Sequence, residues 1–160
     1  MACRGVHFAL TPSQEEQLLT AADDEAVIDV VQEEIEVEWD EDWLSETDKA
    51  WDAIHRCLTD GTLTYAESTP RHWCILGGRQ LCSRNDYTVS YLTAEQVRLA
   101  SQAIQPVTEE ELRQNYFRLS VEWPLSEEDF EYTWENFEAM RGFFERAAEA
   151  GRAVIFTVDT

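Results

Sequence analysis

The last third of the chain combines a long amphipathic helix with a strand that is apolar on both sides. The pattern predicts a helix from about Glu127 to Ala150, preceded by a break at residues 123–126 and ended by Gly151. The strand expected at residues 153–158, Ala-Val-Ile-Phe-Thr-Val, has no polar alternation, which is typical of a strand covered on both faces. Aromatic residues recur along the helix at the spacing of a buried face rather than of a cofactor site. That predicted face contains Phe130, Trp134, Phe137, Arg141, Phe144 and Ala148, with Met140 and Phe143 beside it.

Three further strands and up to five further helices are expected upstream. Helices should begin at Thr11, Thr93 and Thr108, since each threonine is followed three residues later by Gln or Glu, as in a capping box. Strands are expected at residues 6–10, 72–76 and 87–92, and a helix is expected at residues 25–36. About four strands and five or six helices suffice to cover both faces of one sheet, so we expect an α/β fold.

One more predicted helix, from Thr47 to Gly61, places several large residues on one face. Thr47 or Asp48 is expected to cap its start and Gly61 to end it. The shared face carries Trp51, Ile54, His55 and Leu58.

Composition predicts one acidic globular domain spanning residues 1–160. The chain has 33 acidic and 12 basic residues, a net charge of −21, and 44% hydrophobic residues, which argues against disorder. The charge argues against nucleic acid or an anionic membrane as partner and favours a basic protein. Four scattered cysteines without a disulfide framework, no signal-peptide pattern and no apolar run of membrane length together predict a cytoplasmic protein.

Negative charge is concentrated in the first third of the chain. Thirteen acidic residues lie between Asp23 and Asp48, and no Lys or Arg occurs between Gly5 and Asp48. Such a run is either a solvated surface that keeps the protein dissolved or a surface for a positively charged partner. Tryptophans among the carboxylates favour the second interpretation, because aromatic residues often anchor interfaces. The candidate partner-binding residues are Glu38, Trp39, Asp40, Glu41, Asp42 and Trp43.

Common catalytic and cofactor motifs do not fit. The stretch after Asp40 lacks the order of an EF-hand loop, and Gly77-Gly78 is not part of a phosphate-binding glycine motif. No histidine or cysteine set has the spacing of a zinc site, and no cysteine is paired with a base. We therefore expect no metal, no cofactor and no identifiable catalytic residue, with the glycine pair serving as a turn.

His55 allows two interpretations. It lies on the inward face of its helix, where a hydrogen-bonded structural imidazole is common. Alternatively, it is an acid, base or ligand-orienting group in a cleft beside Trp51 and Asp52. The cleft would be closed by Gly77, Gly78 and Tyr87.

The same helix carries a resemblance to a known family. The segment from Asp48 to Thr59, Asp-Lys-x-Trp-Asp-x-Ile-His-x-x-Leu-Thr, with the later Gly77-Gly78 pair and the Leu92-Thr93 helix entry, resembles the YfbM-like proteins, a bacterial family of unknown function. The two ends of the chain are similar as well. The resemblance implies a single three-layer α/β/α-type domain with a small mixed sheet, and it implies no activity.

Three hypotheses for function follow. The first is a non-enzymatic protein-binding module, of the immunity-inhibitor or adaptor kind, whose acidic stretch 33–48 engages a basic protein. The second is an enzyme or small-ligand binder with the cleft around Trp51, Asp52 and His55. The third is a protein without a discrete site, such as a dimerising one.

Overall fold

The computed structural model describes residues 3–64 and 69–159 and contains one five-stranded sheet. The strand order is β2-β1-β5-β4-β3, and every pair of neighbours is antiparallel. The expectation of a mixed sheet of about four strands was therefore wrong in strand direction and low by one strand. The strands are β1 (Gly5–Ala9), β2 (Leu44–Asp48), β3 (Arg79–Gln80), β4 (Tyr87–Leu92) and β5 (Val154–Asp159).

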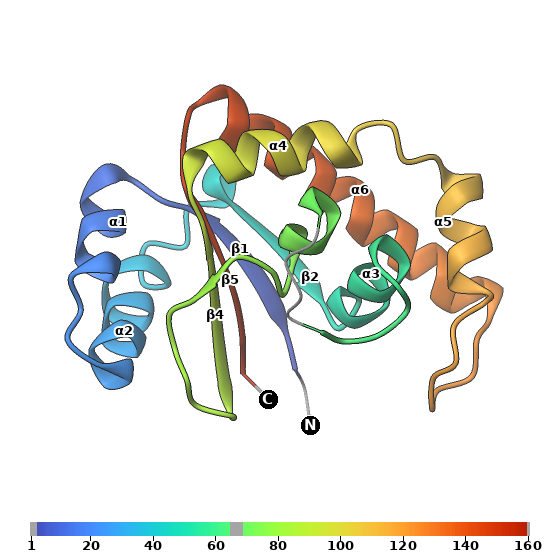
Figure 1. Cartoon of the computed structure of the whole chain (residues 1–160), viewed down its shortest axis with the longest axis horizontal. Coiled ribbons are helices and arrows are strands. Elements are labelled where there is room, and N and C mark those ends of the chain that lie inside the picture. Colours follow the sequence, from blue (N-terminus) through green and yellow to red (C-terminus); the bar gives the residue numbers. More distant parts are fainter. Residues whose placement is uncertain (1–2, 65–68, 160) are drawn as a thin grey trace.

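Six α-helices lie against the two faces of this sheet (Figure 1). Helices α1 and α2 cover one face, and the other four cover the opposite face. A π-helical turn, Val31–Ile35, continues α2, and a short 3-10 turn, Glu41–Trp43, leads into β2. The helices are α1 (Pro12–Leu19), α2 (Asp24–Val30), α3 (Trp51–Leu58), α4 (Ala94–Ile104), α5 (Glu109–Tyr116) and α6 (Glu127–Glu149).

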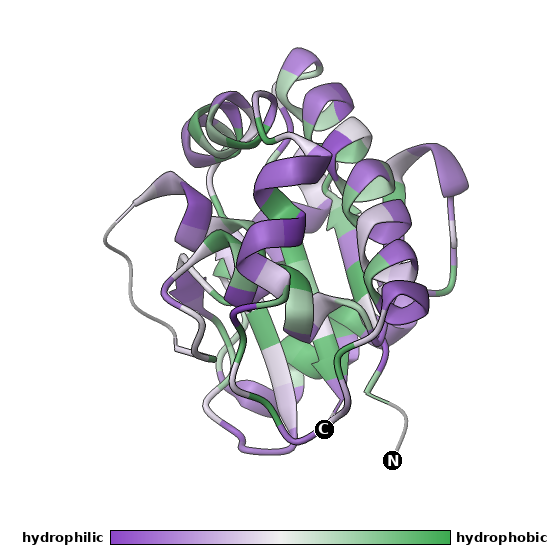
Figure 2. Ribbon diagram, turned by 90° about the vertical axis from the view of Figure 1, so that its right-hand side faces the viewer, coloured by the Kyte–Doolittle hydropathy of each residue, from purple (hydrophilic) through white to green (hydrophobic). Residues whose placement is uncertain are grey.

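Strand β5 explains why both faces are covered. Ile155 points to the core under α1 and α2, whereas Phe156 and its neighbours on alternate positions point to the core under α3 to α6. Figure 2 shows the result, with apolar strands inside and hydrophilic outer turns on the helices that face the viewer.

Helix α6 packs against α4 and β2 along a face slightly rotated from the predicted one. Phe130, Phe137 and Phe144 are fully buried as expected, but Thr133 and Ala147 are buried too, while Trp134 and Arg141 lie half-buried on the flank. The N-cap predictions at Thr11, Thr93 and Thr108 were correct, because each side chain accepts a hydrogen bond from the third helical residue, and at Thr11 and Thr93 the glutamine also completes the capping box. None of the described helices is long and apolar enough to cross a bilayer.

Two local predictions were wrong. Thr47 and Asp48 do not cap α3 but belong to β2, where the Thr47 hydroxyl donates to the carbonyl of Gly5 across 3.2 Å. Residues 72–76 do not form a strand, because the segment Pro70–Cys74 is a 3-10 helix that starts with proline. The strand near it, β3, begins only after the Gly77-Gly78 turn.

Candidate functional site

The acidic stretch forms an exposed surface between α2 and β2. Glu33, Glu34, Glu38, Asp40, Glu41 and Asp42 are exposed and have no ion-pair partner within the described residues, whereas Glu46 and Asp48 in β2 both pair with Arg4. Two large apolar side chains lie among them, Val37 at 70% exposure and Trp39 at 41%. We define the acidic surface as Glu33, Glu34, Val37, Glu38, Trp39, Asp40, Glu41 and Asp42.

The two tryptophans of this region have different environments. Trp39 has φ of 38°, in the left-handed region that residues other than glycine rarely adopt, and its ring edge contacts Phe8 at a centroid distance of 5.9 Å. Trp43 is half-buried, and the guanidinium of Arg152 lies over its ring at 3.6 Å. Trp39 is therefore the more accessible ring.

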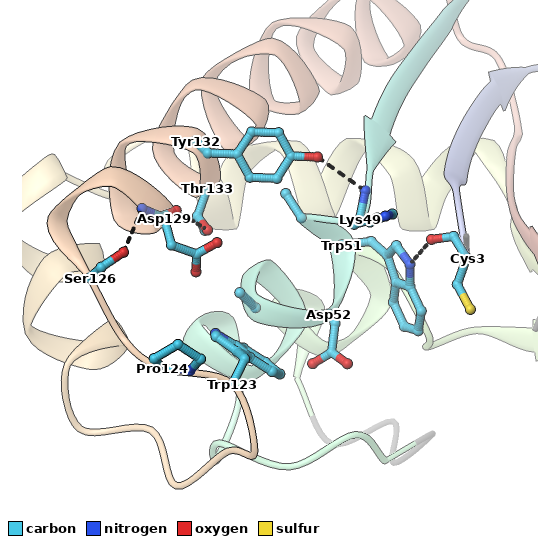
Figure 3. Close-up of a pocket in the computed structure, with 12 residues that line it drawn as sticks. Cys3, Lys49, Trp51, Asp52, Trp123, Pro124, Ser126, Asp129, Tyr132 and Thr133 are labelled. Atoms are coloured by element: carbon cyan, nitrogen blue, oxygen red, sulfur yellow. Dashed lines mark hydrogen bonds between the residues drawn. The ribbon is translucent and has the colours of Figure 1, made fainter. Parts of the chain in front are cut away.

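A separate pocket of about 610 Å³ lies at the other end of β2 (Figure 3). It opens between the start of α3, the first half of α6 and the segment that enters α6, with Cys3 at its edge. Its lining residues are Cys3, Lys49, Ala50, Trp51, Asp52, Ala53, Trp123, Pro124, Ser126, Asp129, Tyr132 and Thr133.

Hydrogen bonds fix two of the rings in the pocket wall. The indole N–H of Trp51 donates to the carbonyl of Cys3 across 2.8 Å. The Tyr132 hydroxyl donates to a carboxylate oxygen of Asp48 across 2.6 Å and accepts from the backbone N–H of Lys49 across 3.3 Å. Asp48 has φ of 49°, in the left-handed region, and this conformation turns the chain from β2 into α3. The Tyr132 hydroxyl therefore contacts the chain at this turn.

Two carboxylates extend toward the pocket from opposite walls (Figure 3). Asp52 forms an ion pair with Arg56 across 2.6 Å on α3. Asp129 accepts a hydrogen bond from the Tyr116 hydroxyl and has no ion-pair partner within residues 3–64 and 69–159. Burial, and then the bond to Asp129, raise the pKa of Tyr116 to about 12, so the phenol stays a donor at neutral pH.

His55 does not line this pocket. Its imidazole is buried, with 1% of the residue exposed, and Nε2–H donates to the carbonyl of Thr64 across 2.9 Å. Burial lowers the pKa of His55 to about 4, so the ring is neutral near pH 7. Of the predicted cleft residues, the structure brings together Trp51 and Asp52 but not His55.

The other predicted cleft residues lie elsewhere. Gly77 and Gly78 form a tight turn before β3, where a Cβ on Gly78 would lie 2.4 Å from the carbonyl oxygen of Tyr91. Tyr87 belongs to the core on the α1 and α2 side, and its hydroxyl donates to Glu36 across 3.4 Å. None of the three lines the pocket between α3 and α6.

Sequence reasoning missed the half of the pocket that α6 and its entry provide. Trp123 was interpreted as part of a chain break, and Asp129 and Tyr132 were not assigned. A usable signal was present, because Asp129 and Tyr132 are three residues apart beside the buried aromatic face and so share one flank of the helix.

The buried thiols and the acidic side chains give no sign of further chemistry. Burial raises the pKa of Cys57 and Cys74 to about 12, so both thiols are protonated at neutral pH. Within the described part of the chain, no three His, Cys, Asp or Glu side chains are grouped to hold a metal ion.

Comparison with protein families identifies the chain. The model of the family described as "Domain of unknown function (DUF1877)" matches residues 1–157. The chain belongs to the DUF1877 family. No curated protein matches it in sequence.

A solved structure connects DUF1877 with the resemblance noted above. The chain is similar to YfbM from Escherichia coli, described as a protein of unknown function, with 16% identity, a TM-score of 0.72 and 99% of each chain covered. At this identity the likeness shows the fold. The YfbM-like resemblance is thus confirmed, and neither DUF1877 nor YfbM carries a described activity.

Proposed function

We propose that the protein is a non-enzymatic binding module, an inhibitor or adaptor, whose acidic surface binds a positively charged protein. The observation that carries this proposal is the exposure of Val37 and Trp39, at 70% and 41%, among carboxylates without ion-pair partners in the described residues. A basic partner would gain both long-range attraction and a flat apolar contact.

The conformation of Trp39 supports a role at the surface. A tryptophan in the left-handed region costs on the order of 1 kcal/mol, yet its ring is only partly covered by Phe8. The contact with Phe8 therefore compensates only a small part of the backbone strain at Trp39. Trp43 has a different role in the proposal. Arg152 covers its ring, so Trp43 would stabilise the acidic surface without contacting the partner.

Replacing Trp39 with Ala tests the proposal. The variant is expected to lose about 2 kcal/mol of binding free energy if the ring is a hot spot. Wild type and variant are immobilised and exposed to lysate of the source cells at low salt, and retained proteins are identified by mass spectrometry. The proposal expects at least one basic protein that the wild type retains, that Trp39→Ala does not retain, and that about 0.5 M salt releases.

Phe117→Ala provides the matched control. Phe117 is an equally exposed aromatic residue, at 42%, and contacts the rings of Tyr116 and Phe130 far from the acidic surface. If Trp39→Ala and Phe117→Ala retain the same proteins as the wild type, the acidic stretch is a solvated surface and the proposal fails.

A further inference from the structure

The pocket between α3 and α6 carries an inference that is independent of the acidic surface, because the two lie at opposite ends of β2. We propose that this pocket binds an organic cation, an ammonium or guanidinium group on an apolar stem, with Asp129 as its counter-ion and Trp123 and Tyr132 against the stem.

The size and the lining fit a small organic group. A volume of about 610 Å³ is within the range of small-molecule sites. Trp51 and Tyr132 are held by hydrogen bonds to Cys3 and Asp48, so two rings of the wall are positioned before any ligand arrives. A preformed wall reduces the entropy lost on binding.

The two carboxylates in the pocket differ in whether they already have a positively charged partner. Asp52 is already neutralised by Arg56 across 2.6 Å. Asp129 accepts from the uncharged phenol of Tyr116, and its own N–H donates to Ser126, so its negative charge has no counter-ion in the described residues. Asp129 is therefore the group that a ligand cation would pair with.

The aromatic wall already accommodates one cation of the protein itself. The guanidinium carbon of Arg56 lies 5.9 Å from the ring centroid of Trp123. Indole rings attract cations through their negative faces, so Trp123 is a wall residue that is compatible with a cationic ligand.

Lys49 makes an anion the competing ligand. It is the single lysine of the chain, lines the pocket at the start of α3 and is exposed. An anion held there would face the unpaired carboxylate of Asp129 in a molecule of net charge −21, whereas a cation would be attracted by that carboxylate. The charge distribution favours the cation.

Three small molecules that share a phenyl ring on a two-carbon chain, but carry a cationic, a neutral or an anionic group, test the sign of the ligand charge. Phenethylamine, phenethyl alcohol and hydrocinnamate are titrated separately into the protein at constant ionic strength, and the indole N–H signals of Trp51 and Trp123 are followed by NMR. The amine is expected to bind about tenfold more tightly than the alcohol, with hydrocinnamate weakest. Tighter binding of hydrocinnamate, or no saturable shift with any probe up to about 10 mM, would overturn the proposal.

Asp129→Asn locates the counter-ion, with Glu145→Gln on the exposed face of α6 as the control that removes the same charge from the same helix. We expect about a tenfold loss of affinity for the amine in Asp129→Asn and none in Glu145→Gln. Unchanged affinity for the alcohol shows that the pocket of the variant is intact. Equal amine affinity in all three proteins contradicts the assignment of Asp129.

Two sources share this chemistry, a free amine and the basic side chain of another protein. N-acetyl-lysinamide separates them, because it carries the ammonium between two peptide groups. Binding at least as tight as that of phenethylamine indicates a side chain, and much weaker binding indicates a free amine; the cation proposal is supported in both cases.

Discussion

Two buried histidines, His7 and His55, are neutral hydrogen-bond donors in the fold. His7 is fully buried among the rings of Phe143, Phe144 and Phe156, with Nε2 2.7 Å from the carbonyl of Cys74. Burial lowers the pKa of both imidazoles from 6.5 to about 4. The unfolded chain therefore binds more protons than the native protein between these values, and the free energy of unfolding falls as pH drops through this window.

His55→Gln isolates this effect for one ring. Glutamine keeps an N–H for the carbonyl of Thr64, so near pH 7 the variant is expected to be about 1–2 kcal/mol less stable than the wild type, through poorer packing. Near pH 4.5 only the wild type must keep the imidazole of His55 neutral against its unfolded pKa, so the difference should change by about 2.5 kcal/mol and reverse, leaving the variant about 0.5–1.5 kcal/mol more stable than the wild type. Urea unfolding at both pH values measures it.

Ile54→Val is the control, because it alters a fully buried neighbour on α3 that does not titrate. Its cost of about 1 kcal/mol should be the same at both pH values. If His55→Gln behaves like Ile54→Val, the imidazole of His55 takes up a proton in the native protein without penalty.

At the scale of elements, the sequence predicted what is decided locally. Thr11, Thr93 and Thr108 form caps with residues three positions away, so the helix starts were found from the sequence. Strand β2 was missed because Leu-Ser-Glu-Thr-Asp has no alternating pattern and becomes a strand only by pairing with β1, about 40 residues earlier. Residues 72–76 have strand propensity, but the 3-10 helix Pro70–Cys74, which starts with proline, takes the place of the strand.

Only the α3 side of the pocket was predicted, because only that side depends on residues close together in the sequence. Trp51 and Asp52 are local to α3, and the helix pattern identified them. Trp123, Asp129 and Tyr132 are more than 70 residues further along and join the site only through the packing of α6 against α3 and β2. His55 was linked to the pocket by helix spacing, but its ring turns toward Thr64 instead.

The glycine turn before β3 makes a prediction about an element boundary. Gly78 has φ of +79°, and a Cβ there would lie 2.4 Å from the carbonyl oxygen of Tyr91. Gly78→Ala is expected to destabilise the protein by about 2–4 kcal/mol, measured by denaturant unfolding.

Gly142→Ala is the matched control for that change. Gly142 lies inside α6 with no atom closer than 3.7 Å to an added Cβ, so alanine should stabilise the helix by about 0.5–1 kcal/mol. Similar stabilities of the two variants would show that the turn can relax around a side chain.

At the scale of the whole molecule, charge repulsion opposes the compact state. The net charge of −21 is carried by an 18.5 kDa chain, and the first third contains the largest block of acids. Dissolved salt screens such repulsion over about 10 Å at 0.1 M. The protein is therefore expected to be less stable at low ionic strength.

A thermal melt in increasing NaCl tests this. The midpoint should rise by several degrees, roughly 3–8 °C, between about 20 mM and 0.5 M salt. The triple variant Glu33→Gln, Glu34→Gln and Glu38→Gln removes three exposed charges and should show a smaller rise. A midpoint that is unchanged or lower in salt would mean that the surface ion pairs outweigh the repulsion.

The neighbouring positions of β1 and β5 have a consequence for how the protein is made. Val6 lies opposite Thr157, and the Thr157 hydroxyl donates to the carbonyl of Val6 from 151 residues away. A ribosome adding about 5–20 residues per second needs roughly 8–30 s to cover that separation. Throughout this interval the edge of β1 that will receive β5 is unpaired, so the nascent chain needs shielding there, and the centre of the sheet closes only when residues 154–159 emerge.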